Sequence, residues 1–362
     1  MGAENAQLGP LCLLRLSAIG DVAHTVAVVR TLQARWPGRP LLWLVGRTEA
    51  AVASLVDGVE VVVVDKRRPF AEARRLRRQL AQHDIAALLH MQVSLRANVI
   101  SLGVRARRRI GFDRARAKEG HGWVINQRIS AAPPPGEHVV DGLMRFPAAL
   151  GAPTPVYRWD LQLPREVRDW ASQRIDPVRA LVAINVCASR PVKDWTAQGF
   201  AAVATHAANR HQAQVVLCGG PTAHERTMAA AIETASGVPI VNLVGATTLP
   251  QLIAVLERAA VLVSPDSGPV HLATAVGTPV IGLYGATNLA RCGPYLERRW
   301  CVDRRAEAAQ KLLGKRVDDL RWSEVVAGGM SLIEPDAVIA RLDAAFAERP
   351  GPGVKAEQRK HR

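Results

Sequence analysis

Short aliphatic runs recur along this chain, and a stretch of helical character separates each run from the next. The runs lack the alternation of half-exposed strands, so their side chains are expected to be buried on both faces of a sheet. Parallel sheets have this property because the connecting helices cover both faces. Parallel strands are expected at residues 11–16, 41–45, 60–64, 85–90 and 109–112, and again at residues 181–187, 214–218, 239–243, 261–264 and 279–284. Helices are expected at residues 22–36, 48–55, 69–82, 95–102 and 335–348.

The same order of strands and helices occurs twice, which indicates two domains. The length of 362 residues also exceeds the size at which one hydrophobic core keeps growing. A Pro- and Gly-rich segment at residues 151–155, followed by a polar run to Asp176, separates the halves. We predict an α/β fold of two facing, Rossmann-like, doubly wound domains at residues 1–165 and 166–348, with a basic disordered tail at residues 349–362. Ligands of such sheets bind beyond the carboxyl ends of the strands, so the active site is expected in the cleft between the domains.

The net charge of +15 is concentrated in the first half of the chain. Residues 1–180 hold 27 Lys and Arg against 16 Asp and Glu, whereas residues 181–362 hold 20 against 16. Much of the excess lies in two runs, residues 66–78 and 105–118. A single run of this kind is ordinarily a solvated face, but the two together favour an anionic partner. Aromatic residues make up only 4% of the chain, too few to stack bases, so nucleic acid is not the expected partner.

Several classes of protein are disfavoured. No apolar run approaches the roughly 20 residues that span a bilayer, and we expect no signal peptide because the first residues lack its basic-then-apolar pattern. The five cysteines are scattered without zinc-binding spacing, which indicates buried thiols in a reducing cytoplasm. The sequence has no cluster of carboxylates of the kind that would indicate an obligatory metal. We therefore expect Mg²⁺ to be at most an optional cofactor. One glycine, Gly20, stands where a dinucleotide-binding loop needs three, which argues against an NAD-dependent enzyme.

Asp21 follows the first expected strand, in the segment Arg-Leu-Ser-Ala-Ile-Gly-Asp-Val-Ala-His-Thr at residues 15–25. Gly20 would permit a tight turn that places Asp21 at the start of the next helix, pointing into the cleft. A carboxylate at that position is either a helix N-cap, worth roughly 1 kcal/mol, or a general base.

In the second half, four loops that follow expected strands carry small, polar or cationic residues. Each loop alone has an ordinary explanation, such as an exposed loop lysine or a capped helix. Together they suit a nucleotide diphosphate, because cations and the unpaired N–H groups of a helix N-terminus both favour phosphate. The loops contribute Ser189, Arg190 and Lys193, then Glu225 after a Gly-Gly-Pro turn, then residues 245–249, and last Asp266-Ser267-Gly268.

These segments together resemble the ADP-heptose:lipopolysaccharide heptosyltransferases, which form glycosyltransferase family nine. The pairing of Ile-Gly-Asp with Asp-Ser-Gly-x-x-His at this separation is specific, and the resemblance extends from about residue 11 to residue 346. His24, after Gly-Asp-Val-Ala, makes the chain more similar to heptosyltransferase I than to heptosyltransferase II. The matching segments are residues 13–25, Lys193-Asp-Trp195, Gly245-Ala-Thr-Thr-Leu249 and residues 266–279.

The resemblance implies the GT-B fold and transfer of L-glycero-D-manno-heptose, with inversion, from ADP-heptose to the Kdo region of the lipopolysaccharide inner core. Asp21 would deprotonate the acceptor hydroxyl, and Lys193 would hold the donor phosphates beside Ser189 and Arg190. Asp266 would accept hydrogen bonds from heptose hydroxyls. The remaining donor-binding positions are Glu225 at the ribose, Thr247 at the nucleoside, and Ser267, Gly268 and His271 at the diphosphate. The chain departs from the family pattern where Ala223 and His224 precede Glu225, and in a long segment at residues 302–330.

The basic first half is assigned to the acceptor, Kdo–lipid A or core lipopolysaccharide, whose carboxylates and phosphates are anionic. Because that acceptor lies in an anionic leaflet, we expect a monomeric enzyme attached peripherally to the cytoplasmic face of the inner membrane. The expected acceptor-binding residues are Ser17, Gly20, His24, Arg67, Arg68, Arg74, Gln92 and Arg96.

Two alternatives stay open. The first is a family relative that uses another nucleotide sugar or a later core position, because members without heptose specificity exist. The second is a non-catalytic basic protein that binds nucleic acid or a membrane, because charge indicates partners and not fold.

Overall fold

The computed structural model describes residues 9–348, and the tail expected at residues 349–362 lies outside the described residues. The chain divides into two compact units, Met1–Gln162 and Leu163–Arg362. Each unit contains one six-stranded sheet whose paired strands all run parallel. The expectation of two doubly wound α/β units is confirmed. Within residues 9–348, the structure contains no helix that combines the length and apolarity needed to cross a membrane.

The first sheet has its strands in the order β3-β2-β1-β4-β5-β6. They are β1 (Leu11–Leu14), β2 (Leu41–Gly46), β3 (Glu60–Val64), β4 (Ile85–His90), β5 (Ala106–Gly111) and β6 (Gln127–Arg128). Strand β1 pairs with β4 as well as with β2, so the chain changes its direction of progress across the sheet between β1 and β4. Ligands of open α/β sheets bind beyond the carboxyl ends of the strands at such a switch point.

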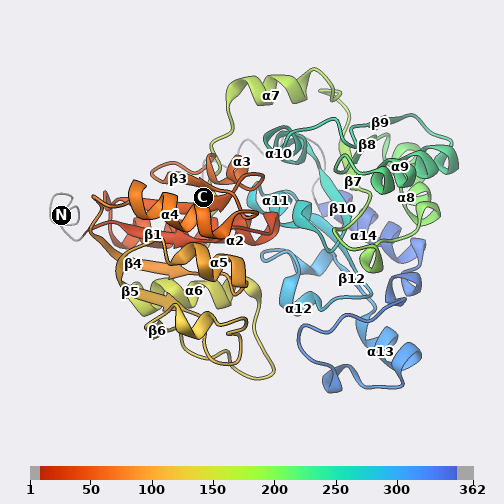
Figure 1. Cartoon of the computed structure of the whole chain (residues 1–362). Coiled ribbons are helices and arrows are strands. Elements are labelled where there is room, and N and C mark those ends of the chain that lie inside the picture. The colour runs from red at the N-terminus through yellow and green to blue at the C-terminus, as the bar shows by residue number, and fades with distance from the viewer. Residues whose placement is uncertain (1–8, 349–362) are drawn as a thin grey trace. The chain divides into compact units, whose positions relative to one another are not determined.

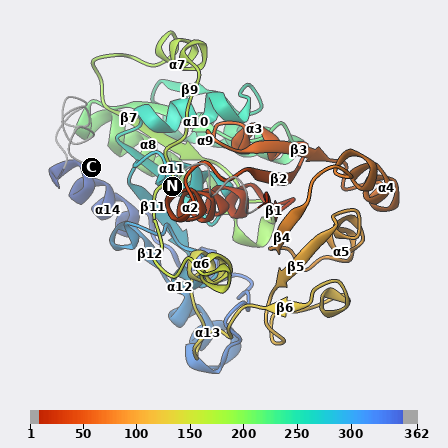
Figure 2. The same cartoon turned by 90° about the vertical axis from the view of Figure 1, so that its left-hand side faces the viewer.

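Helices cover both faces of this sheet. The helices α4 and α5 lie side by side (Figure 2) and bury Leu76 and Ile100 against strand residues such as Leu14 and Val64. The helix α2 is buried along most of its length and packs against α6. Their bounds are α2 (Ile19–Arg35), α3 (Ala50–Ala53), α4 (Pro69–Gln79), α5 (Leu95–Ser101) and α6 (Val139–Leu150).

The second sheet repeats the same arrangement, with the order β12-β11-β10-β7-β8-β9. Its strands, green to blue in Figure 1, are β7 (Leu181–Asn185), β8 (Gln214–Cys218), β9 (Ile240–Asn242), β10 (Val261–Pro265), β11 (Val280–Tyr284) and β12 (Val302–Asp303). Strand β7 pairs with both β8 and β10. The switch point of this sheet therefore lies between β7 and β10.

Two groups of helices flank the second sheet. The helices α8, α9 and α14 contribute Phe200, Ile232 and Leu342 to one apolar core, which they share with the strands. The helix α10 contacts α7, α11 and β7. The bounds are α7 (Arg165–Ser172), α8 (Ala197–His211), α9 (Ala223–Ser236), α10 (Leu249–Arg258), α11 (Gly268–Ala275), α12 (Leu289–Cys292), α13 (Arg305–Leu313) and α14 (Pro335–Glu348).

The start of α2 differs from the expectation in a way that bears on the site. The helix begins at Ile19, with Ala18 in an extended conformation as its N-cap. Gly20 consequently lies inside the first helical turn, and it is not among the glycines with positive φ. The prediction of a tight turn at Gly20 was wrong, because the connection from β1 to α2 is made by residues 15–18, before the helix begins at Ile19.

The bounds of other helices and strands also differ from those expected from the sequence. The helix expected at residues 48–55 spans only Ala50–Ala53, because turns follow it and Gly58 adopts a φ of +70°. The strand expected at residues 109–112 begins at Ala106, which pairs with Ile85 of β4. The polar run expected to connect the domains contains α7. The unfamiliar segment at residues 302–330 forms β12, α13 and short 3-10 turns.

Candidate active site

Asp21 is held at the switch point of the first sheet. Its carboxylate accepts a hydrogen bond from the backbone N–H of Ala18 at 3.3 Å and forms an ion pair with Arg15. Arg15 also donates to the backbone carbonyl of Met91, which follows β4. The loops after β1 and β4 therefore both fix the carboxylate. Because the Asp21 side chain is still 30% exposed, a ligand can reach it.

Gln92 connects the same two loops. Its Oε1 accepts from the backbone N–H of Leu16 at 2.7 Å and of Ser17 at 3.2 Å, and its Nε2 donates to Ser17 Oγ at 3.2 Å. Lys66 supports the loop from the other side, donating to the Leu16 carbonyl at 3.3 Å and to Glu49 at 2.9 and 3.0 Å. The predicted residues Ser17 and Gln92 are thus brought together with Asp21. Sequence reasoning missed the Lys66–Glu49 pair, since neither residue belongs to a motif.

Two predicted acceptor residues lie deeper than expected. His24 is only 3% exposed, and its ring packs edge-on against His138 at a centroid distance of 5.7 Å. Gly20 is buried in the first turn of α2. For both residues, direct contact with an acceptor remains a prediction, and their observed role is packing around the start of α2.

The predicted acceptor arginines are exposed. Arg67 and Arg68 precede α4, Arg74 lies on α4, and Arg96 lies on α5. Arg75 differs from its neighbours, because it donates to Glu72 and to the carbonyl of Val63.

Two arginines of the second run, residues 105–118, serve internal contacts. Arg109 donates to the carbonyls of Val124, Val104 and Ser101 at 2.6, 2.6 and 2.9 Å. Arg116 pairs with Asp113 and Glu137. The sequence could not distinguish these arginines from exposed ones, because their partners lie in other segments. The run at residues 66–78 is the better candidate for an anionic ligand.

In the second unit, Lys193 and Asp266 join the loops after β7 and β10. Lys193 Nζ donates to the Asp266 carboxylate and to its backbone carbonyl, both at 3.0 Å. The two side chains are 15% and 9% exposed. A cation and an anion thus meet at the switch point of this sheet, where ligands of such sheets bind.

Asn185, the last residue of β7, holds the neighbouring loop in shape. Its buried amide donates to the Cys187 carbonyl at 2.7 Å, to Ser264 Oγ at 3.2 Å and to Ser267 Oγ at 3.1 Å. Sequence reasoning did not select Asn185 as a site residue. The sequence feature that could have indicated it is a polar residue at the carboxyl end of an otherwise apolar strand.

The α11 N-terminus follows directly. Ser267 is the N-cap with an extended backbone, and no side chain caps the first turn. Gly268, which has no side chain, and Pro269 begin the helix. Ser267 and His271 are 8% and 7% exposed. Because a helix N-terminus favours negative charge, this turn can hold a phosphate beside Lys193.

The other predicted donor residues follow β7, β8 and β9. Glu225 belongs to a capping box at the start of α9, where it accepts from the backbone N–H of Gly220 at 2.6 Å and of Thr222 at 3.3 Å. Its carboxylate therefore has a structural role, and ribose recognition remains a prediction. Thr247 is partly buried in the loop after β9, and Ser189 and Arg190 are exposed in the loop after β7.

One group with metal-ligand chemistry lies near Lys193 and consists of Cys187, Asp194 and His224. His224 Nε2 lies 2.7 Å from Asp194, whose other oxygen accepts from the Ala188 backbone N–H at 2.6 Å. Burial and the nearby carboxylates raise the pKa of the Cys187 thiol to about 12. Because metals bind the thiolate, we interpret this group as a network that shapes the loop before Lys193. All five cysteines are buried, as expected.

Comparisons with known proteins identify the family. Residues 73–320 match the sequence family described as Glycosyltransferase family 9 (heptosyltransferase). The chain is 36% identical over 334 residues to the lipopolysaccharide core heptosyltransferase OpsX of Haemophilus influenzae, covering 92% of this chain and 95% of that protein.

Two solved structures share the fold. One is E. coli ADP-heptose lps heptosyltransferase II, with a TM-score of 0.72, 21% identity and coverage of 94% of this chain and 99% of the other. The other is E. coli heptosyltransferase WaaC with ADP-2-deoxy-2-fluoro heptose, with a TM-score of 0.67, 20% identity and coverage of 92% and 99%. The GT-B fold expected from the sequence is confirmed.

Proposed function

Since the chain belongs to glycosyltransferase family 9, the heptosyltransferases, we propose that it transfers L-glycero-D-manno-heptose from ADP-heptose to Kdo in the lipopolysaccharide inner core. The H. influenzae relative is a lipopolysaccharide core heptosyltransferase, and the WaaC structure contains an ADP-sugar analogue. Both names support this donor and this acceptor class.

The second unit binds the donor. The observation that carries the proposal is the Lys193–Asp266 pair beside the first turn of α11, which no side chain caps. A diphosphate at this turn would accept hydrogen bonds from the helix N–H groups and compete with Asp266 for the Lys193 ammonium. The displaced Asp266 carboxylate would then be available to heptose hydroxyls.

The first unit binds the acceptor, and Asp21 is its general base. Asp21 takes the proton of the acceptor hydroxyl while the hydroxyl oxygen bonds to the anomeric carbon. The bond from that carbon to the ADP oxygen breaks, and ADP leaves with the electron pair. Attack opposite the leaving group inverts the anomeric carbon. Lys193 and the α11 N-terminus stabilise the charge that grows on ADP.

The exposed arginines at residues 67, 68, 74 and 96 support an anionic acceptor at a membrane surface. Each basic residue near an anionic leaflet contributes about 1 kcal/mol of attraction. We therefore place the enzyme at the cytoplasmic face of the inner membrane, attached peripherally through the first unit.

The reaction as proposed needs no metal, because Lys193 and the α11 N-terminus supply the positive charge that a metal would bring. Mg²⁺ is compatible with the chemistry but not required. Turnover measured with EDTA should match turnover with Mg²⁺, and a loss of more than tenfold in EDTA would contradict this assignment.

The test of the proposed function is a matrix of donors and acceptors. The donors are ADP-heptose, ADP-glucose and UDP-glucose, and the acceptors are Kdo–lipid A and Kdo–lipid A that already carries one heptose. We expect ADP release only with ADP-heptose and unsubstituted Kdo–lipid A, and a product with inverted configuration by NMR. Preference for another nucleotide sugar, or for the heptosylated acceptor, would overturn the assignment of substrate.

A further inference from the structure

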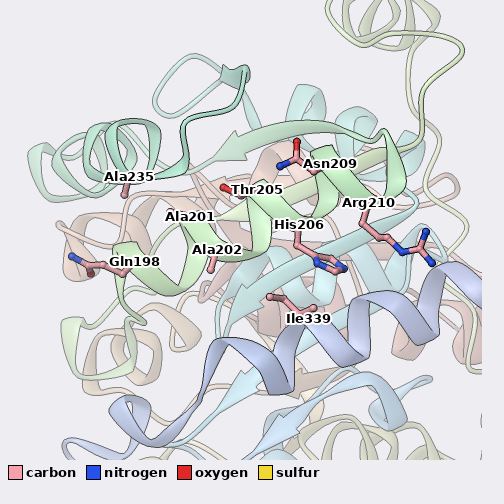
Figure 3. Close-up of a pocket in the computed structure, with 9 residues that line it drawn as sticks. All are labelled: Gln198, Ala201, Ala202, Thr205, His206, Asn209, Arg210, Ala235 and Ile339. Carbon is pink, nitrogen blue, oxygen red and sulfur yellow. The ribbon is translucent and has the colours of Figure 1, made fainter.

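Two imidazoles and one carboxylate meet between α8 and α14 of the second unit. His206 and His211 lie on α8, and Asp343 lies on α14. The Nε2 atoms of His206 and His211 lie 2.7 and 2.6 Å from the same oxygen, Oδ1 of Asp343. Figure 3 shows His206 extending from α8 toward α14.

This group has no part in the proposed chemistry. His211 is the last residue of α8, and β8 begins at Gln214, three residues later. The group is therefore near the amino end of β8, whereas the donor loops follow the carboxyl ends of the strands. A function here is independent of heptosyl transfer.

The three side chains present the ligand atoms of a transition-metal site. One ligand atom from each lies within 4.8 Å of the others. Two imidazole nitrogens and a carboxylate oxygen suit Zn²⁺ and its neighbours, whereas Mg²⁺ and Ca²⁺ prefer oxygen ligands throughout. No sulfur is present in the group, so Cu(I) is not favoured.

A metal could enter from solvent. The His206, His211 and Asp343 side chains are 26%, 17% and 45% exposed. His206 also lines a surface groove of about 550 Å³, together with Asn209 and Ile339 (Figure 3). Water from this groove can complete a coordination sphere that the protein leaves open.

The surroundings of this group orient its side chains and favour a bound cation. One nearby charge, that of Arg210, opposes a cation. The His211 ring stacks on Phe346 at a centroid distance of 4.2 Å and an angle of 15°, which limits its rotation. Burial raises the pKa of Asp343, but hydrogen bonds from both imidazoles outweigh it, so the pKa is lowered and the carboxylate is anionic. The carboxyl end of α8 adds negative potential, which Arg210 in the same turn opposes.

We propose that His206, His211 and Asp343 form a zinc-type metal site, completed by water, that ties α14 to α8. The metal would bind the two Nε2 atoms that now hydrogen-bond to Asp343 Oδ1, and each imidazole would carry its proton on Nδ1 instead. Tetrahedral coordination with bonds of about 2.0–2.1 Å separates ligand atoms by roughly 3.4 Å, so each nitrogen must move about 0.7 Å from the oxygen. A small rotation of Asp343, which is exposed, provides this movement.

The experiment uses the full-length protein freed of metal by EDTA and dialysis. Co²⁺, a spectroscopic substitute for Zn²⁺, is titrated while its visible d–d absorption is recorded, and melting is measured with and without Zn²⁺. The variants are His206→Gln and Asp343→Asn. The matched control is His224→Gln, which removes the imidazole of the other His/Asp group. Circular dichroism of the metal-free proteins shows whether each variant is folded.

The wild type should bind one Co²⁺ with tetrahedral bands, and Zn²⁺ at 100 times its Kd should raise Tm by about 5–10 °C. Each ligand variant should lose more than the roughly 100-fold in affinity typical of second-sphere changes, while His224→Gln keeps wild-type binding. Should His206→Gln fail to fold, Asp343→Asn alone carries the comparison. Absence of binding in the wild type, or binding that survives in the ligand variants, would show an ordinary His–Asp ion pair and overturn the proposal.

Discussion

Replacing Lys193 by Met tests whether the Lys193–Asp266 pair shapes the donor site. The change leaves the Asp266 carboxylate, 9% exposed, without its counter-charge and with a Cys292 Sγ contact at 3.5 Å. Removing one partner of a buried ion pair lowers the free energy of unfolding by about 3–5 kcal/mol. Because this pair is still partly exposed, we expect a loss near the lower limit, about 3 kcal/mol. For a unit of 200 residues, this corresponds to a decrease in Tm of about 6–12 °C.

The companion change Asp266→Asn should lower the free energy of unfolding by less, about 1–2 kcal/mol. In this variant Lys193 keeps its hydrogen bond to the backbone carbonyl of residue 266, at 3.0 Å in the wild type. The double variant should cost less than the sum of the two, with a coupling free energy of about 1–3 kcal/mol. The assay is thermal and urea unfolding of the full-length protein. Lys311→Met serves as a matched control, because its ion pair with Glu307 is exposed on the surface and its loss should leave Tm unchanged.

ADP binding gives the second readout of Lys193→Met. Loss of the cation should weaken ADP, measured by calorimetry, by at least tenfold, since a charge-assisted contact with phosphate contributes about 1.5–3 kcal/mol. The reasoning would be refuted by additive costs in the double variant, by a Tm equal to that of Lys311→Met, or by unchanged ADP affinity.

Three further predictions concern the acceptor face, acid stability and a buried thiol. Replacing Arg67, Arg68 and Arg74 by Gln should lower kcat/KM for the acceptor roughly 100-fold, since each arginine contributes about 1 kcal/mol of attraction. The affinity for ADP should stay unchanged, and equal losses for acceptor and ADP would contradict the assignment. Burial and the charge of Arg128 lower the pKa of His121 to about 4, so the unfolded state binds an extra proton between pH 6.5 and 4, and the free energy of unfolding should fall by up to about 3 kcal/mol over that window. Urea titrations at pH 7 and 4.5 should show this loss in the wild type and a smaller one in His121→Gln, and equal losses would refute it. Cys187, with its pKa raised to about 12, should resist iodoacetamide at pH 8 in the folded protein, and rapid alkylation would contradict the buried, protonated thiol.

The parallel sheets could be predicted because their signal is local. Five apolar runs in each half correspond to strands β1–β5 and β7–β11. The position of Asp21 directly after β1 follows from the same pattern. Helix ends were less predictable, because the N-cap Ala18 makes no side-chain cap bond and therefore has no recognisable residue type.

The partners within the site could not be predicted, since they depend on contacts between distant segments. Lys193 and Asp266 are 73 residues apart, and only the pairing of β7 with β10 brings them together. In the sequence, Arg109 cannot be distinguished from the other basic residues of its run. In the structure it donates to three backbone carbonyls. The strand order that creates both switch points is likewise not contained in any single segment.

The role of Asp21 is tested most directly by Asp21→Asn, assayed for ADP release from ADP-heptose with Kdo–lipid A. Asn is nearly isosteric and its side-chain oxygen can still accept from the Ala18 N–H, so the local structure should persist. Loss of a general base should lower kcat by about 10²–10⁴-fold, with ADP affinity within a factor of two of the wild type. Turnover within a few-fold of the wild type would contradict the account, because the carboxylate would then not be the group that receives the proton.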